Sequence, residues 1–148
     1  KPHTLGRNGA WVIRLFANAI ETYTNENLLS CAIDYVIPVP LSFSRKISRG
    51  YNQAALIAQR IAHVLKRPLL KSVLYRTSQI AQSVLTRKDR LTNPQGNFMI
   101  RPAHIIHGKV ILLTDDIYTT GSTVNECARL LRSAGAQRVI VFSLARTI

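Results

Sequence analysis

The spacing of apolar residues divides the chain into helical and extended segments. Apolar residues three or four positions apart predict helices over Trp11–Tyr23, Tyr51–Lys66 and Ser122–Ala134. Short apolar runs rich in β-branched residues predict strands over Ala32–Val39, Asn97–Ile100, Lys109–Thr114 and Arg138–Leu144. The pattern leaves Leu69–Tyr75 open between helix and strand and predicts a loop over Thr77–Asp89. On the first helix, the apolar face comprises Val12, Leu15, Phe16 and Ala19.

The last third of the chain predicts the fold class. Lys109–Thr114 and Arg138–Leu144 are apolar runs, typical of strands in a parallel sheet that is covered on both faces. The helix between them begins at a capping box of Thr123 and Glu126 and ends before Gly135. A strand, a helix and a strand in this order form a crossover, so we expect an α/β fold with a doubly wound, mostly parallel sheet and helices on both faces. Ligands of such sheets bind beyond the carboxyl ends of the strands.

Length and composition are those of one folded domain over residues 1–148. Apolar residues make up 47% and charged residues 18%, which argues against disorder. The longest apolar run is far short of the ~20 residues of a membrane helix, and no signal-peptide pattern is present. We therefore expect a cytoplasmic protein without a transmembrane segment, either free or peripheral at the inner membrane. Cys31 and Cys127 lie far apart without a CxxC pair, which indicates two buried thiols.

An excess of positive charge indicates an anionic partner. The chain has 20 Lys and Arg residues against 7 Asp and Glu residues, a formal net charge of +13. Thirteen of the basic residues lie between Arg45 and Lys109, together with one acid, Asp89. Such a surface attracts nucleic acid, phosphorylated metabolites or anionic lipid. A solvated basic surface without a partner is the alternative that charge alone leaves open.

The segment VILLTDDIYTTGST, Val110–Thr123, places two carboxylates and a hydroxyl-rich turn after a buried strand. Backbone amides at the start of a helix, the helix dipole and the hydroxyls form a cradle for a phosphate group. The residues of this cradle are Thr119, Thr120, Gly121, Ser122 and Thr123. Asp115 and Asp116 would repel a phosphate, but they suit sugar hydroxyls or a Mg²⁺ ion. A phosphorylated, activated ribose satisfies all of these groups.

The same segment resembles the phosphoribosyl pyrophosphate (PRPP) motif of the type I phosphoribosyltransferases. The resemblance implies that Asp115 and Asp116 are the catalytic pair, which bind the ribose 2′- and 3′-hydroxyls directly or through Mg²⁺. It also implies that the turn from Thr119 to Thr123 binds the 5′-phosphate. Some purine transferases have an aspartate two residues before the glycine of this motif. Thr119 stands there in this chain, which argues against a hypoxanthine-type reaction but not against PRPP binding.

Two further segments make the chain similar to the ComF/GntX family of competence proteins. They are Ile37–Ala54 (IPVPLSFSRKISRGYNQA) and Ala81–Phe98 (AQSVLTRKDRLTNPQGNF). The resemblance implies a pyrophosphate loop with Pro38, Val39, Pro40, Arg45 and Arg49. It also implies a flexible loop over the site with Gln82, Ser83, Arg87 and Arg90. The residues alone leave other roles open, namely a rigid proline turn with surface arginines, helix capping by Asn52 and Gln53, and packing or turn roles in the second segment.

The resemblance and the charge together suggest two functions. The first is a protein that binds PRPP and Mg²⁺ and acts in natural transformation by handling incoming single-stranded DNA. The second is an active enzyme that moves 5-phosphoribosyl from PRPP to a nitrogen nucleophile in nucleotide metabolism or salvage. A third hypothesis is that the protein is a purely structural partner of a competence helicase. Family members usually carry a four-cysteine zinc module that these residues lack, so we expect it to precede Lys1.

Overall fold

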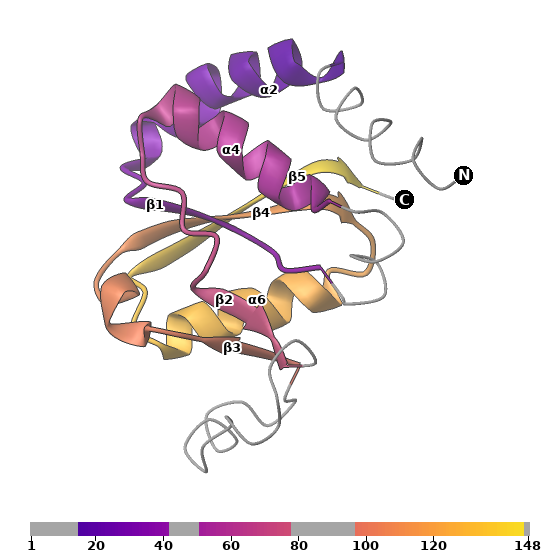
Figure 1. Cartoon of the computed structure of the whole chain (residues 1–148). Helices are drawn as coiled ribbons and strands as arrows, with labels where there is room; N and C mark the ends of the chain where they lie inside the picture. The colour runs from indigo at the N-terminus through magenta and orange to yellow at the C-terminus, as the bar shows by residue number, and fades with distance from the viewer. Residues whose placement is uncertain (1–14, 42–50, 78–96, 147–148) are drawn as a thin grey trace.

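The protein has an α/β fold in which a parallel sheet carries helices on both faces, as predicted (Figure 1). The computed structural model describes residues 15–41, 51–77 and 97–146. The described α-helices are α2 (Ala17–Tyr23), α4 (Gln53–Leu65) and α6 (Ser122–Ser133). The strands are β1 (Tyr35–Pro38), β2 (Leu74–Arg76), β3 (Phe98–Ile100), β4 (Val110–Tyr118) and β5 (Arg138–Arg146). A π-helix (Thr24–Leu28) and 3-10 turns (Leu29–Cys31 and Ala103–Ile106) complete them.

The main sheet has the order β1-β4-β5, and both pairs are parallel. Figure 1 shows α2 and α4 on one side of this sheet and α6 with the antiparallel β2–β3 pair on the other. Strand β4 lies in the middle and its side chains alternate between two cores. Ile111 and Leu113 pack toward α6, whereas Val110 and Leu112 pack toward α4. Burial on both faces explains the continuous apolar run in this strand.

The two longer helices form where the apolar spacing predicts them. Helix α4 buries five side chains against the sheet: Ala54, Ile57, Ala58, Ile61 and Ala62. Helix α6 buries Val124, Cys127, Leu130 and Leu131. After it, Gly135 adopts φ +96, the left-handed conformation expected of a glycine that follows a helix. The predicted capping box is wrong, because the N-cap residue is Gly121, which makes no side-chain cap bond, and Glu126 instead accepts a hydrogen bond from Asn97.

Two predicted strands differ from the structure, and one segment that the sequence left open is resolved by it, because tertiary pairing decides all three. Strand β4 continues past Thr114 to Tyr118, since β5 stays paired with it as far as Arg146. Strand β5 lies at an edge of the described sheet, and Phe142 is its one buried residue. The open segment Leu69–Tyr75 forms a bridge from Leu69 to Val36 and then the start of β2.

The first helix turns a different face to the core from the predicted one. Ile20 is buried, whereas Leu15 and Phe16 are 65% and 44% exposed. Both cysteines are free thiols; Cys127 is buried as expected and Cys31 is half-buried. Within residues 15–41, 51–77 and 97–146, no helix is long and apolar enough to cross a membrane.

Candidate functional site

The candidate site lies where β1 and β4 end, at the carboxyl edge of the parallel sheet. The Val39 amide donates to the Thr114 carbonyl at 2.9 Å, which continues the pairing of the two strands by one residue. This bond brings the Pro38-Val39-Pro40 turn beside the residue that precedes Asp115. Val39, Pro40 and both aspartates line one pocket at this edge.

Two polar side chains connect this edge to the start of α4. Asn52 is the N-cap of α4 and accepts a hydrogen bond from the Ala55 amide at 3.4 Å. Its Nδ2 group also donates to the Val39 carbonyl at 3.1 Å, so the cap residue holds the proline turn as well. The Thr114 hydroxyl is fully buried and donates to the Ala54 carbonyl at 3.1 Å. The capping role left open for Asn52 is confirmed, and Gln53 is the first helical residue.

Asp115 and Asp116 lie within β4, before the turn that follows this strand. Both side chains are half-buried and both line the pocket. Asp115 Oδ1 accepts a hydrogen bond from the Asp116 amide at 2.9 Å, and Asp116 Oδ1 accepts one from the Ile117 amide at 3.0 Å. These bonds to backbone amides restrict how the carboxylates can turn. The strand therefore presents the acidic pair in a defined orientation.

The turn before α6 is built around Gly121, which adopts φ +75 as the N-cap of the helix. A Cβ atom at this position would lie 2.2 Å from the Tyr118 hydroxyl, so the glycine allows the tyrosine to pack over the turn. The hydroxyls of Thr120 and Ser122 form a hydrogen bond of 3.1 Å, and the Ser122 amide donates to Thr120 Oγ1 at 3.4 Å. Backbone amides at the start of α6 and hydroxyls thus lie together, as a phosphate cradle requires.

A pocket of about 350 Å³ brings together residues from the sheet edge, the Gly121 turn and α4. Of the ten predicted site residues that the structure describes, eight line it: Val39, Pro40, Asp115, Asp116, Thr119, Gly121, Ser122 and Thr123. Two predicted residues do not line it, since Pro38 is buried in β1 and Thr120 contacts Ser122 beside the pocket. Arg45, Arg49, Gln82, Ser83, Arg87 and Arg90 lie outside the described residues.

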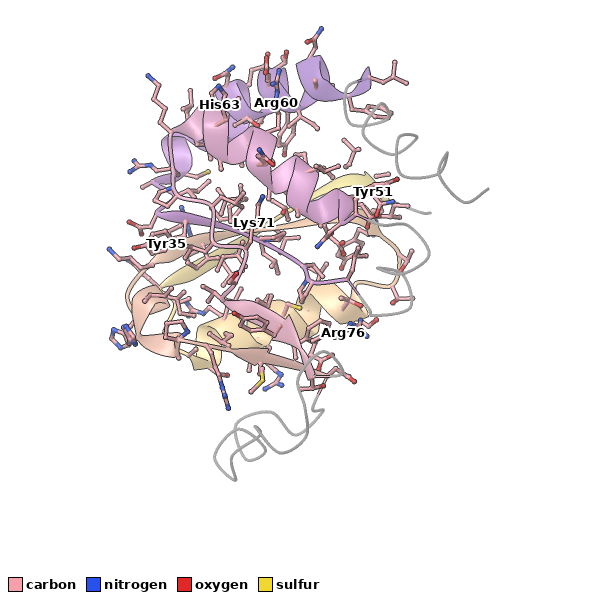
Figure 2. All side chains as sticks on the ribbon, viewed as in Figure 1. Tyr35, Tyr51, Arg60, His63, Lys71 and Arg76 are labelled. Carbon is pink, nitrogen blue, oxygen red and sulfur yellow. The ribbon has the colours of Figure 1, made fainter. Side chains whose placement is uncertain are left out.

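Residues that the sequence did not single out also line this pocket: Leu41, Arg76, Ile117, Tyr118 and Val124. Arg76 ends β2, and its guanidinium lies over the Phe98 ring at 4.7 Å. Figure 2 labels Arg76 on the side of the sheet that carries α6. No local sequence pattern singles out Arg76, because its strand is recognisable only from the pairing with β3.

The charges near the pocket affect a neighbouring thiol. Burial raises the pKa of Cys127 well above that of an exposed thiol, the carboxylates of Glu126 and Asp115 add to the rise, and Arg76 opposes it. Cys127 is therefore a packing residue rather than a nucleophile.

Within the described part of the chain, no three His, Cys, Asp or Glu residues gather as a metal site. A Mg²⁺ ion here would depend on Asp115 and Asp116, which suits an ion that keeps several water ligands.

Comparison with known proteins places the chain in a family. The phosphoribosyl transferase domain family matches residues 28–147, so the chain belongs to this family. The relatives include competence protein F of Haemophilus influenzae, which is 38% identical over 113 residues, or 75% of this chain and 49% of the relative. The DNA utilization protein YhgH of Escherichia coli O157:H7 is 35% identical over 78% of the chain and 50% of its own length. Competence protein ComFC of Streptococcus pneumoniae is 31% identical over 89% of the chain and 57% of its own length.

These relatives confirm the resemblance to ComF-type competence proteins, and the chain spans about half of their length. Solved structures confirm the fold. An adenine phosphoribosyltransferase superposes with a TM-score of 0.63 at 15% identity, covering 93% of this chain and 71% of the other. The adenine phosphoribosyl transferase of Trypanosoma brucei, in complex with AMP, pyrophosphate and ribose-5-phosphate, gives 0.56 at 15% identity, covering 88% and 52%. The chain is thus related in sequence to competence proteins and has a phosphoribosyltransferase fold.

Proposed function

We propose that the pocket at the carboxyl edge of the sheet binds PRPP together with Mg²⁺. The observation that carries this proposal is the convergence of Asp115, Asp116, the Gly121 turn and the Val39-Pro40 turn in one pocket of about 350 Å³. Pockets of this size accommodate small ligands. The T. brucei enzyme of the same fold is described in complex with pyrophosphate and ribose-5-phosphate, the two halves of PRPP, which supports the choice of ligand.

The 5′-phosphate of PRPP binds at the start of α6. This helix has 12 residues, so its dipole and its first amides favour an anion at this end. Ser122 and Thr123 line the pocket there and offer hydroxyl donors. The phosphate is therefore recognised by backbone and hydroxyl groups without a carboxylate.

Asp115 and Asp116 bind the ribose hydroxyls, directly or through Mg²⁺. Carboxylate oxygens accept hydrogen bonds from hydroxyls and are hard ligands suited to magnesium. When bound, Mg²⁺ supplies positive charge that neutralises the pyrophosphate. Arg76 adds a cation to the same pocket, and the Val39-Pro40 turn lies beside the acidic pair.

Calorimetric titration tests this ligand. PRPP should bind in a buffer with Mg²⁺ and at least about tenfold more weakly in a buffer with EDTA, a difference of ~1.4 kcal/mol. Absence of PRPP binding in both buffers contradicts the proposal.

The biological role that fits best is natural transformation through the handling of incoming single-stranded DNA. The names of the relatives, competence protein and DNA utilization protein, support this role, as does the net charge of +13. A cytoplasmic location, either free or peripheral at the inner membrane, and a competence helicase as protein partner stay predictions of the same role. Binding of an oligonucleotide must weaken linearly on a plot of log K against log salt, because phosphate contacts release counterions. A flat plot contradicts DNA handling through this basic chain.

Phosphoribosyl transfer is the alternative, and one observation favours it. Asp115, Asp116 and the Val39-Pro40 turn line the same pocket, which is the arrangement needed to hold a ribose while pyrophosphate departs. The acceptor is a nitrogen nucleophile, and Thr119 argues against a hypoxanthine-type purine. Release of pyrophosphate from PRPP in the presence of bases or amines is the assay. Release that depends on the acceptor supports an enzyme, whereas PRPP binding without release leaves a binding protein.

A further inference from the structure

A second pocket of about 560 Å³ lies beside the PRPP pocket, between α6 and the base of the β2–β3 pair. Its charged and amide side chains come from both elements: Arg76 and Asn97 from the pair, and Asn125, Glu126 and Arg129 from α6. Asn125 and Arg129 are four positions apart, so they lie on one face of the helix. None of these residues of α6 belongs to the PRPP pocket.

The two pockets share a wall. Arg76, Ser122 and Thr123 line both of them. Arg76 is the charged member of this wall, and its guanidinium lies against the Phe98 ring, which also lines the second pocket. A ligand in the second pocket therefore contacts the cation that lies at the edge of the PRPP pocket.

Two buried polar atoms of the second pocket have no hydrogen-bond partner among the described residues. They are Nε of Arg76, which is a donor, and Oε1 of Glu126, which is an acceptor. The other oxygen of Glu126, Oε2, accepts from Asn97 at 3.2 Å. Buried polar groups are nearly always paired, and these two atoms are closed to solvent although their residues line one pocket. The unpaired donor and acceptor therefore call for a partner that they meet when the two side chains turn toward the pocket.

The chemistry of these two atoms selects the ligand. A phosphate alone offers only acceptors, so it would leave Glu126 unpaired and meet its negative charge. A nucleobase offers both kinds of group on one edge; cytosine, for example, has an amino donor that suits a glutamate and a ring acceptor beside it. Arg129 is exposed at the rim, where it can pair with a phosphate. We propose that the second pocket binds one nucleotide, with its base on Glu126 and Arg76 and its phosphate on Arg129.

The nucleotide is either part of a DNA strand or free in solution. That it comes from a DNA strand rests on the proposed DNA handling. The pocket itself does not depend on PRPP binding. Because Arg76 serves both pockets, the Arg76→Gln variant weakens nucleotide binding in the second pocket and PRPP binding in the first. The Arg129→Gln and Glu126→Gln variants weaken nucleotide binding and leave PRPP binding unchanged.

Three measurements test the inference: fluorescence anisotropy with labelled oligo(dC), the same with a labelled abasic strand of equal length, and calorimetric titration of dCMP. The matched control is Lys71→Gln, an exposed residue that lines neither pocket and that Figure 2 shows apart from Arg76. Arg129→Gln lowers the slope of log K against log salt by about 0.7, the value for one phosphate contact on a single strand. Wild type prefers oligo(dC) to the abasic strand by about tenfold, and Glu126→Gln, which keeps an acceptor for Asn97, removes most of that preference.

The outcomes separate this inference from the proposed function. If dCMP binds to wild type but not to Arg129→Gln, and wild type binds neither strand, the nucleotide pocket is supported and the DNA role is contradicted. If oligo(dC) binds but Arg129→Gln and Glu126→Gln behave like Lys71→Gln, the DNA role stands and the nucleotide pocket is overturned. Equal affinity of wild type for the abasic strand and for oligo(dC) also overturns it, because the base contact is then absent. Unchanged circular dichroism shows that each variant is folded.

Discussion

Replacement of Asn52 tests how the site is held together. Asn52 caps α4 through the Ala55 amide at 3.4 Å and holds the Val39 carbonyl at 3.1 Å. Asn52→Ala removes both bonds, whereas Asn52→Ser keeps a capping oxygen but is too short to reach Val39. The two variants therefore separate the cap from the contact with the proline turn.

The expected losses follow from the geometry. The cap bond is long, so we assign it the lower end of the usual range, about 0.5 kcal/mol. Val39 is only 5% exposed, so its carbonyl loses a partner with little access to water, which costs about 1 kcal/mol or more. Asn52→Ser should then lower the free energy of unfolding by about 1 kcal/mol and Asn52→Ala by about 1.5 kcal/mol.

Urea denaturation measures these losses, provided that the slope m stays the same in each variant. Calorimetric titration of the same proteins measures their affinity for PRPP. Both variants should bind PRPP more weakly, because Val39 and Pro40 line the pocket. A serine variant as stable as wild type, with unchanged PRPP affinity, would refute the idea that Asn52 positions the turn. Equal destabilisation by serine and alanine would show that the cap contributes nothing.

Two further predictions concern the turn and the buried thiol. Gly121→Ala should cost about 1–2 kcal/mol, because its φ of +75 disfavours a side chain and its Cβ would meet the Tyr118 hydroxyl. A thermal melt should show part of that loss recovered in a Tyr118→Leu background, and no recovery would contradict the clash. Because burial raises the pKa of Cys127, the unfolded state loses its thiol proton first as pH rises. The free energy of unfolding should therefore fall above about pH 8.5 by up to 1.4 kcal/mol per pH unit, and Cys127→Ala should remove that fall in urea denaturation; an equal fall in both proteins would contradict it.

The elements that sequence predicts well are those whose burial is uniform. Strand β4 is covered on both faces, which produces its unbroken apolar run, and α6 follows as an amphipathic helix. Elements that depend on a partner strand are harder. The length of β4 reflects its pairing with β5, and β2 exists through its pairing with β3. No local pattern contains that information.

The residues of the site also divide into those that the sequence predicts and those that depend on the fold. The acidic pair and the Gly121 turn lie in one continuous segment whose residue types express their chemistry, so they could be predicted. Arg76 comes from a short strand remote in sequence, and its place in the pocket depends on the fold. Tyr118 lies within the same segment, but its packing over Gly121 is a consequence of three-dimensional contact. The sequence allows helix capping by Asn52 as one alternative, whereas the bond from Asn52 to Val39 depends on the fold.

Calorimetric titration of PRPP in Mg²⁺ into the Asp115→Asn/Asp116→Asn variant tests the central claim most directly. The control is Asp34→Asn, which removes one carboxylate that bonds the Val110 amide and pairs with Lys109 outside the pocket. Loss of charge-assisted hydrogen bonds to the ribose or to the metal should cost about 3 kcal/mol, or about hundredfold in affinity, whereas the control should bind PRPP nearly as wild type does. Wild-type affinity in the folded double variant would show that the acidic pair does not bind PRPP.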